Sequence, residues 1–140
     1  MIGELLQREA LPVPYGIYHG SNVYRAIRGD LPDIVVSEPL QLPPTFLVER
    51  GEASISSSFH LTEGDYAIHG GGTSWEGDGY LALERCGALV WLVHLPQSEE
   101  FVSAEFTADD VVAKSFTYPR GFRVEIPITD PHKLRIEAMA

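Results

Sequence analysis

Two histidines, His60 and His69, come closest to a metal-binding pattern in this chain of 140 residues. Both lie in segments where polar and apolar residues alternate, which predicts strands. If Glu63-Gly64 makes the turn between those strands, the two histidines are diagonal neighbours about 7–8 Å apart at the backbone. That separation permits shared metal ligation, with Asp65 or His94 as a third ligand.

The stretch from His60 to Asp65 has some likeness to a cupin strand pair, so a cupin-like metal-dependent enzyme that uses His60 and His69 is one hypothesis. The cupin pattern needs His-x-His followed by a nearby Glu, and here only His60 stands in that place. Histidines on the polar face of a strand are more often simply exposed. The primary expectation is therefore that the protein is not an enzyme and holds no metal and no cofactor.

Acidic residues are concentrated in the middle of the chain. The sequence has 20 acidic and 10 basic residues, and its formal charge is −10. Eleven of the acids and only one base fall within residues 51–113, so the rest of the chain sums to zero. A nucleic-acid partner is excluded because binding to phosphates needs a basic face. Either the acidic segment keeps the surface solvated, or it binds a basic protein such as a toxin.

The candidate partner-binding residues come from this acidic segment and its glycine-rich stretch at 70–79. They are Glu63, Asp65, Trp75, Glu76 and Asp78. The sequence predicts that residues 70–79 form a loop between strands, in which glycine supplies positive φ angles. An aromatic residue on such a loop anchors an interface or folds back as a lid. A small-ligand or carbohydrate binder that uses Trp75 is therefore a further alternative.

The elements that must position these residues are almost all strands. The first twelve residues predict one short helix, which Pro12 and Pro14 end. From residue 45 to 138 the apolar residues recur with a period of two, interrupted by turn residues. This pattern predicts a single all-β domain over residues 1–140, folded as an antiparallel sandwich or an open barrel of about ten strands.

Within that pattern several segments carry specific expectations. Residues 46–49 are expected to form a strand, and Ala53, Ile55, Phe59 and Leu61 are expected to share one face of the next strand. Residues 88–95 are apolar on both faces, which predicts a central strand that buries Trp91. Val102, Ala104 and Phe106 are expected to share one face of a later strand.

The expected compartment is the cytoplasm. The single cysteine, Cys86, cannot make an internal disulfide, which is typical of a reducing environment. The first residues lack the basic and long apolar regions of a secretory signal. No apolar run approaches the roughly 20 residues that a membrane helix needs, so no membrane partner is expected.

Residues 70–101 resemble one family of small bacterial proteins. A glycine-rich loop precedes the motifs Trp75-x-Gly77-Asp78-Gly79-Tyr80-x-Ala82-Leu83, Leu89-x-Trp91-Leu92 and Ser98-Glu99-Glu100-Phe101. This order is similar to that of immunity-type proteins of toxin–immunity systems. Such proteins neutralise a toxin by binding it, so the resemblance implies a binding protein without catalytic residues.

Overall fold

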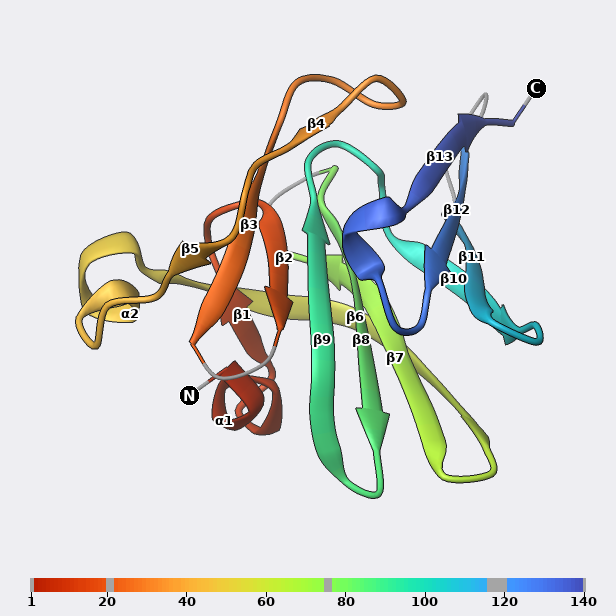
Figure 1. Ribbon diagram of the computed structural model, residues 1–140, viewed down its shortest axis with the longest axis horizontal. Coiled ribbons are helices and arrows are strands. Elements are labelled where there is room, and N and C mark those ends of the chain that lie inside the picture. The colour runs from red at the N-terminus through yellow and green to blue at the C-terminus, as the bar shows by residue number, and fades with distance from the viewer. Residues whose placement is uncertain (1, 20–21, 75–76, 116–120, 140) are drawn as a thin grey trace.

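The computed structural model describes residues 2–19, 22–74, 77–115 and 121–139 (Figure 1). Over these residues the protein is all-β, as the sequence predicts, with two antiparallel sheets and short helical segments. The helical segments are α1 (Ile2–Gln7), α2 (Phe46–Arg50) and the 3-10 helix η1 (Pro131–Lys133). None of the helices in the described ranges is long and apolar enough to cross a bilayer.

The larger sheet has nine strands and contains every strand before residue 96. These are β1 (Ala10–Pro12), β2 (Gly16–His19), β3 (Val23–Arg28), β4 (Val35–Val36), β5 (Leu40–Gln41), β6 (Glu52–Glu63), β7 (Tyr66–Thr73), β8 (Gly79–Arg85) and β9 (Ala88–Leu95). Their order in space is β1-β6-β7-β8-β9-β2-β3-β4, and β5 also pairs with β3. The strands from β6 to β9 form a meander, and β2 then joins the far side of β9.

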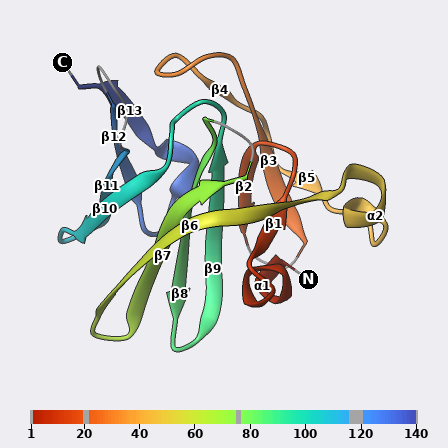
Figure 2. The same cartoon turned by 180° about the vertical axis from the view of Figure 1, so that it is seen from behind.

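The smaller sheet follows in the chain and has four strands. These are β10 (Phe101–Phe106), β11 (Asp110–Ser115), β12 (Phe122–Pro127) and β13 (Arg135–Ala138). Figures 1 and 2 show this sheet beside one face of the larger sheet, whereas α1 lies against strands near the other end of the molecule. The sandwich is thus the predicted alternative that the protein adopts, with thirteen strands in the described residues instead of about ten.

Two apolar clusters lie on opposite faces of the larger sheet, as the alternation of side chains along β8 shows. Leu81 and Leu83 belong to the cluster between the two sheets. Tyr80 and Ala82 belong to the second cluster, which includes Leu5 of α1. The larger sheet is therefore buried on both faces at β8 and β9, which explains why Tyr80–Leu83 and all of β9 except His94 are apolar.

The expected central strand is confirmed. β9 lies between β8 and β2, and Trp91 on it is only 1% exposed. The indole Nε1 of Trp91 donates a hydrogen bond of 3.1 Å to the carbonyl oxygen of Ile128, in the segment that follows β12. Trp91 thus joins the two sheets by both packing and a hydrogen bond.

The predicted strand at residues 46–49 is wrong, because this segment is the helix α2. The amide of Phe46 donates to the carbonyl of Pro43, which starts a helical turn directly after two prolines. The turn buries Phe46 against the rings of Tyr18 and Tyr24 and leaves Val48 88% exposed. A four-residue alternation fits one helical turn as well as it fits a short strand.

The predicted loop at residues 70–79 is also wrong over its first four residues, where β7 continues as far as Thr73. Gly70 leaves room for the Phe59 ring, which would lie 2.6 Å from an added Cβ. At Gly71 an added Cβ would overlap the backbone carbonyl of Ser57. The glycines therefore allow β6 and β7 to approach closely, and they do so inside the sheet and not in a loop.

Two irregular pairings change which side chains share a face. A register shift between Ile55 and Ser57 interrupts β6, so that Ile55 packs on the α1 side while Phe59 packs between the sheets. The expected single face is therefore wrong. A similar shift after Phe101 buries that residue and leaves Val102 48% exposed. An extra residue in one strand reverses the alternation beyond it.

Candidate functional site

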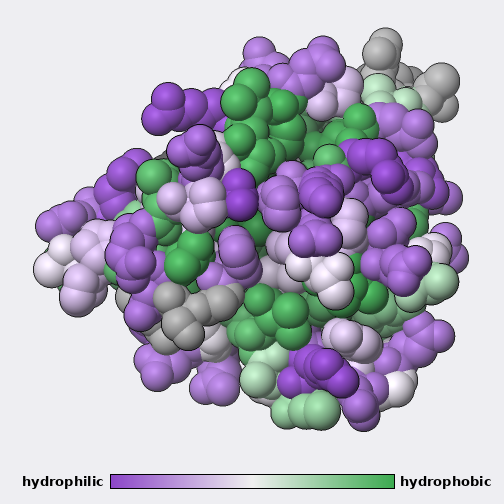
Figure 3. All heavy atoms as spheres, in the orientation of Figure 1, coloured by the Kyte–Doolittle hydropathy of each residue, from purple (hydrophilic) through white to green (hydrophobic). Residues whose placement is uncertain are grey.

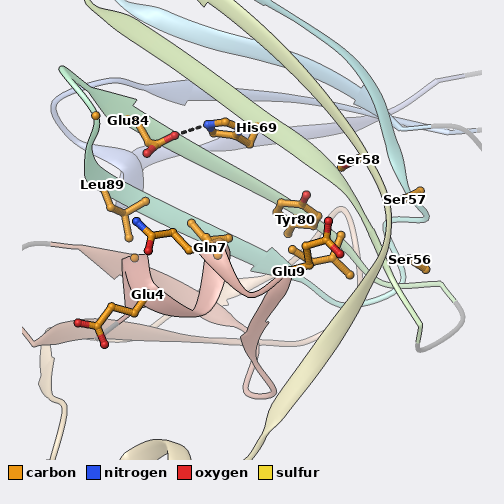
Figure 4. A pocket seen from close by; sticks show the side chains of 14 residues that line it. Glu4, Gln7, Glu9, Ser56, Ser57, Ser58, His69, Tyr80, Glu84 and Leu89 are labelled. Atoms are coloured by element: carbon orange, nitrogen blue, oxygen red, sulfur yellow. Dashed lines mark hydrogen bonds and ion pairs between the residues drawn. The ribbon is translucent and has the colours of Figure 1, made fainter.

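A cleft of about 640 Å³ lies between α1 and the face of strands β6 to β8 (Figure 4). We call it the α1 cleft. Its lining consists of Gly3, Glu4, Leu6, Gln7, Glu9, Ile55, Ser56, Ser57, Ser58, His69, Tyr80, Glu84, Gly87 and Leu89. Clefts that bind small ligands or side chains are usually about 300–1,000 Å³ and combine an apolar lining with a few polar groups. The α1 cleft has both properties.

An imidazole–carboxylate pair lies on the sheet side of the α1 cleft. His69 on β7 is paired with Ala82 on β8, and Glu84 follows two residues later on the same face. The Nε2 atom of His69 donates to the Oε1 atom of Glu84, and both side chains are about one-third exposed. Figure 4 shows this pair facing the space next to α1. Glu84 keeps a second oxygen to accept hydrogen bonds from a ligand.

His60 and His69 are closer than the sequence predicts. Glu63 pairs with Tyr66, so Gly64-Asp65 is the turn and His60 lies directly opposite His69. The two imidazoles stack, with ring centroids 5.0 Å apart and planes 15° from parallel. Among the described residues no group of three or more His, Cys, Asp or Glu side chains could hold a metal ion. The cupin-like arrangement of converging ligands is therefore not formed by these two histidines.

Glu9 adopts an unusual backbone conformation at the edge of the α1 cleft. Its φ angle is +58°, in the left-handed region that Gly and Asn adopt more readily. Two backbone hydrogen bonds hold this conformation. The Glu9 N–H donates to the Leu6 carbonyl, and the Glu9 carbonyl accepts from the Ile55 N–H. In Figure 4 its side chain lies beside Tyr80. Burial, and then the charge of Glu9, raise the pKa of Tyr80 to about 12.

Acidic side chains predominate in the α1 cleft. Its described lining includes the carboxylates of Glu4, Glu9 and Glu84 but no lysine or arginine, and the imidazole of His69 is paired with Glu84. Figure 4 shows Glu4 pointing away from the sheet, so Glu9 and Glu84 are the acids beside the enclosed space. Apolar side chains, among them Leu6 and Leu89, line the remainder. This arrangement favours a ligand with a cationic end and an apolar stem.

Two of the predicted partner-binding residues, Glu63 and Asp65, are exposed at the β6–β7 turn. Their surroundings are not purely acidic, because the guanidinium of Arg85 lies 5.6 Å from the centroid of the Tyr66 ring. Trp75 and Glu76 lie outside the described residues. Glu63 and Asp65 thus lie at the same turn but are not among the residues that line the α1 cleft.

Asp78 does not belong to an acidic surface, which corrects the predicted partner-binding set. It is only 5% exposed, and its carboxylate accepts hydrogen bonds from the Tyr15 hydroxyl at 2.9 Å and from the backbone N–H of Gln97 at 3.2 Å. The Nε2 atom of His94 lies 4.0 Å away, and the Nδ1 atom of His94 donates to the Pro12 carbonyl. Asp78 thus holds together segments far apart in the sequence.

The buried His94 predicts a loss of stability in mild acid. Desolvation lowers its pKa below 6.5, although Asp78 and two backbone carbonyls oppose this shift. As the pH falls, the unfolded chain binds a proton at His94 before the folded protein does. The contribution of His94 to the free energy of unfolding is therefore fully present above pH 6.5 and decreases below it, by up to about 1.4 kcal/mol per pH unit. We expect His94→Asn to reduce this slope between pH 7.5 and 5.5, measured by urea unfolding at each pH.

Asparagine is chosen because its amide nitrogen takes the place of Nδ1 and keeps the bond to Pro12. His19, whose pKa is also lowered by burial, remains in the variant, so a smaller slope is expected and not a flat profile. An unchanged slope would show that His94 does not carry the pH dependence.

The comparisons with known proteins do not identify this chain. No protein-family model matches it, and neither the curated proteins nor the solved structures include a match. The residues beside the enclosed space were missed at the sequence level because Glu9 and Glu84 are far apart in the chain. The one available local signal was the alternation of β8, which places Tyr80, Ala82 and Glu84 on one face.

Proposed function

We propose that this protein is a non-enzymatic protein-binding module that receives a basic segment of a partner protein in the α1 cleft. The observation that carries the proposal is the lining, which has acids on both sides of the enclosed space, and in which His69, the basic residue among the described lining residues, is paired with Glu84. A cation entering such a space exchanges water for carboxylates that are already held in place, which reduces the cost of binding.

An arginine side chain suits this lining best. Its guanidinium forms charge-assisted hydrogen bonds with carboxylates, and these are stronger than neutral ones. Glu84 offers the oxygen that His69 does not use, and Glu9 faces the same space. The aliphatic stem would then lie along Leu6 and Leu89.

The volume of the cleft supports a second candidate. A volume of about 640 Å³ is ample for a small organic cation, and it also accommodates an arginine with its neighbouring residues. The predicted small-ligand alternative is therefore kept, with Glu9 and Glu84 as the binding groups in place of Trp75. The two candidates share one ligand chemistry and differ in the size of the molecule.

The acidic hairpin end, Glu63 and Asp65, would contribute to the rate of association with a basic protein. Complementary charges act mainly on association and are screened beyond about 8 Å at physiological salt. The resemblance to immunity-type proteins would make this partner a toxin. The exposed, unpaired Cys86 fits a reducing compartment such as the cytoplasm, which we include in the proposal.

The test is an NMR titration with a short peptide that contains one arginine, capped at both ends. We expect the signals of His69 and Tyr80 to shift with peptide, and much less with the same peptide carrying neutral citrulline. Glu84→Gln should weaken binding about tenfold, because a hydrogen bond to a charged group contributes roughly 1.5–3 kcal/mol. Agmatine, a small organic cation, is titrated in parallel.

Glu9→Gly separates a binding role from a structural one. Glycine tolerates the φ of +58° without strain, so this variant should unfold at the same or a higher urea concentration while its affinity for the peptide falls. Glu38→Gln, an exposed substitution with the same change in charge, should bind normally. Binding of agmatine without the peptide would favour the small-ligand candidate, and equal binding of the citrulline peptide would contradict both.

A further inference from the structure

Arg25 on β3 is a cation with no acidic partner among the described residues of a strongly acidic protein. It makes no ion pair with any described residue, although Arg8, Arg123 and Arg135 each pair with glutamate. Its Nη1 atom donates to the Ser37 carbonyl at 3.1 Å, but its Nε atom is buried and has no hydrogen-bond partner. A buried donor on a charged group is costly to leave unpaired.

A second unpartnered nitrogen lies next to Arg25. His19 on β2 pairs with Val23, and Arg25 pairs with Ile17, so His19 and Arg25 are diagonal neighbours on one face of the sheet. The Nε2 atom of His19 is also buried and has no partner. The face is the one on which Ile17 joins the cluster between the two sheets. Diagonal neighbours on adjacent strands are within reach of long side chains.

A third basic side chain, that of His132, is near enough for its charge to affect His19. His132 lies in η1, the short blue coil before β13 in Figure 1. Burial lowers the pKa of His19, and the charges of Arg25 and His132 lower it further. The charges of Arg25 and His132 therefore both act on His19, and an anion bound beside these side chains would offset them.

We propose that His19, Arg25 and His132 form a second binding site, which takes an oxyanion, either a phosphate or a carboxylate group. The free Nε of Arg25 and the Nε2 of His19 would each donate to an oxygen of the ligand, and His132 would approach from η1. A guanidinium edge presents two parallel donors, which match two oxygens of one phosphate or carboxylate. The site is independent of the α1 cleft, since none of its three residues lines that cleft.

Figure 3, in the orientation of Figure 1, shows a face of the molecule that is mainly hydrophilic, with separate hydrophobic areas between the polar ones. Because the whole chain has a charge of −10, an anion is repelled at long range and binding relies on short contacts. We therefore expect a small anionic group to be bound in preference to a large polyanion.

The experiment is thermal unfolding of the full chain in sodium phosphate, sodium acetate and sodium chloride at equal ionic strength. A ligand that binds only the folded protein raises Tm as its concentration increases. We expect Tm to rise and then saturate with increasing phosphate, acetate or both, by more than it rises in chloride. Comparison of the phosphate and acetate series shows which oxyanion is preferred. Arg25→Gln should weaken the effect at least tenfold.

The control is Arg28→Gln, which removes one charge from an exposed residue of the same strand. It should leave the effect unchanged. His19→Gln is the second variant, because it retains the bond from Arg25 to Ser37 and tests the site even if Arg25→Gln fails to fold. A rise in Tm no greater than that in chloride would overturn the proposal, as would an equal loss of the effect in Arg28→Gln.

Discussion

Replacement of Trp91 by alanine is expected to lower the free energy of unfolding by about 3–5 kcal/mol, the range for deleting a buried aromatic side chain. Trp91 is 1% exposed, lies on the central strand β9 and contributes to the cluster between the sheets. Its loss leaves a cavity there and also removes the only described hydrogen-bond donor to the Ile128 carbonyl. The measurement is urea unfolding followed by far-UV circular dichroism.

Two variants show which part of this effect comes from each interaction. Trp91→Phe retains most of the ring but lacks the Nε1 donor, so we expect a loss nearer to about 1–2 kcal/mol, the cost of one unpaired polar group. Val102→Ala, at a position 48% exposed, should be close to neutral. A loss below about 1 kcal/mol for Trp91→Ala would contradict the burial of the indole.

Replacement of Gly71 by alanine is the second change with a large expected effect. The added Cβ would overlap the Ser57 carbonyl oxygen, and the Ser57 carbon and Ser58 Cα lie close behind it. All three are backbone atoms of β6, so a side-chain rotation cannot relieve the clash. We expect a loss of about 3 kcal/mol or more, or failure to fold, since overpacking that moves backbone costs at least the upper part of the usual 1–3 kcal/mol range.

Gly64→Ala is the matched control for this substitution. Gly64 lies in the β6–β7 turn with φ +59°, and an added Cβ there would meet no atom within 4 Å. Its replacement therefore reports only the backbone penalty of about 1–2 kcal/mol. If the two alanine variants unfold at the same urea concentration, close packing of β6 against β7 is not what requires Gly71.

The period-two alternation made most of the fold predictable. A strand with one face in the core buries one side, so its inward residues can be recognised from a few neighbouring positions, as in Phe122–Ile126. The same local pattern predicts that β9 is central, because a strand that is buried on both faces is apolar on both faces. These features depend on composition over six to eight residues and need no knowledge of the rest of the chain.

Other features depend on contacts between residues far apart in the chain, and they could therefore not be predicted from the sequence. The glycines at 70–72 have the composition of a loop, but they lie in a strand, and at Gly70 and Gly71 the Phe59 ring and the Ser57 carbonyl occupy the space where side chains would be. The shift after Ile55 reversed the face of that strand, and Asp78 became buried because Tyr15 and Gln97 supply its hydrogen bonds.

The α1 cleft was the least predictable feature. Its acids, Glu9 and Glu84, line one cleft only because α1 folds across strands formed much later in the chain. Local alternation reports whether a residue faces a core, since burial of apolar surface is a property of each residue and its near neighbours. Which distant residue stands opposite it is set by strand order and register, and these are properties of the whole packed chain.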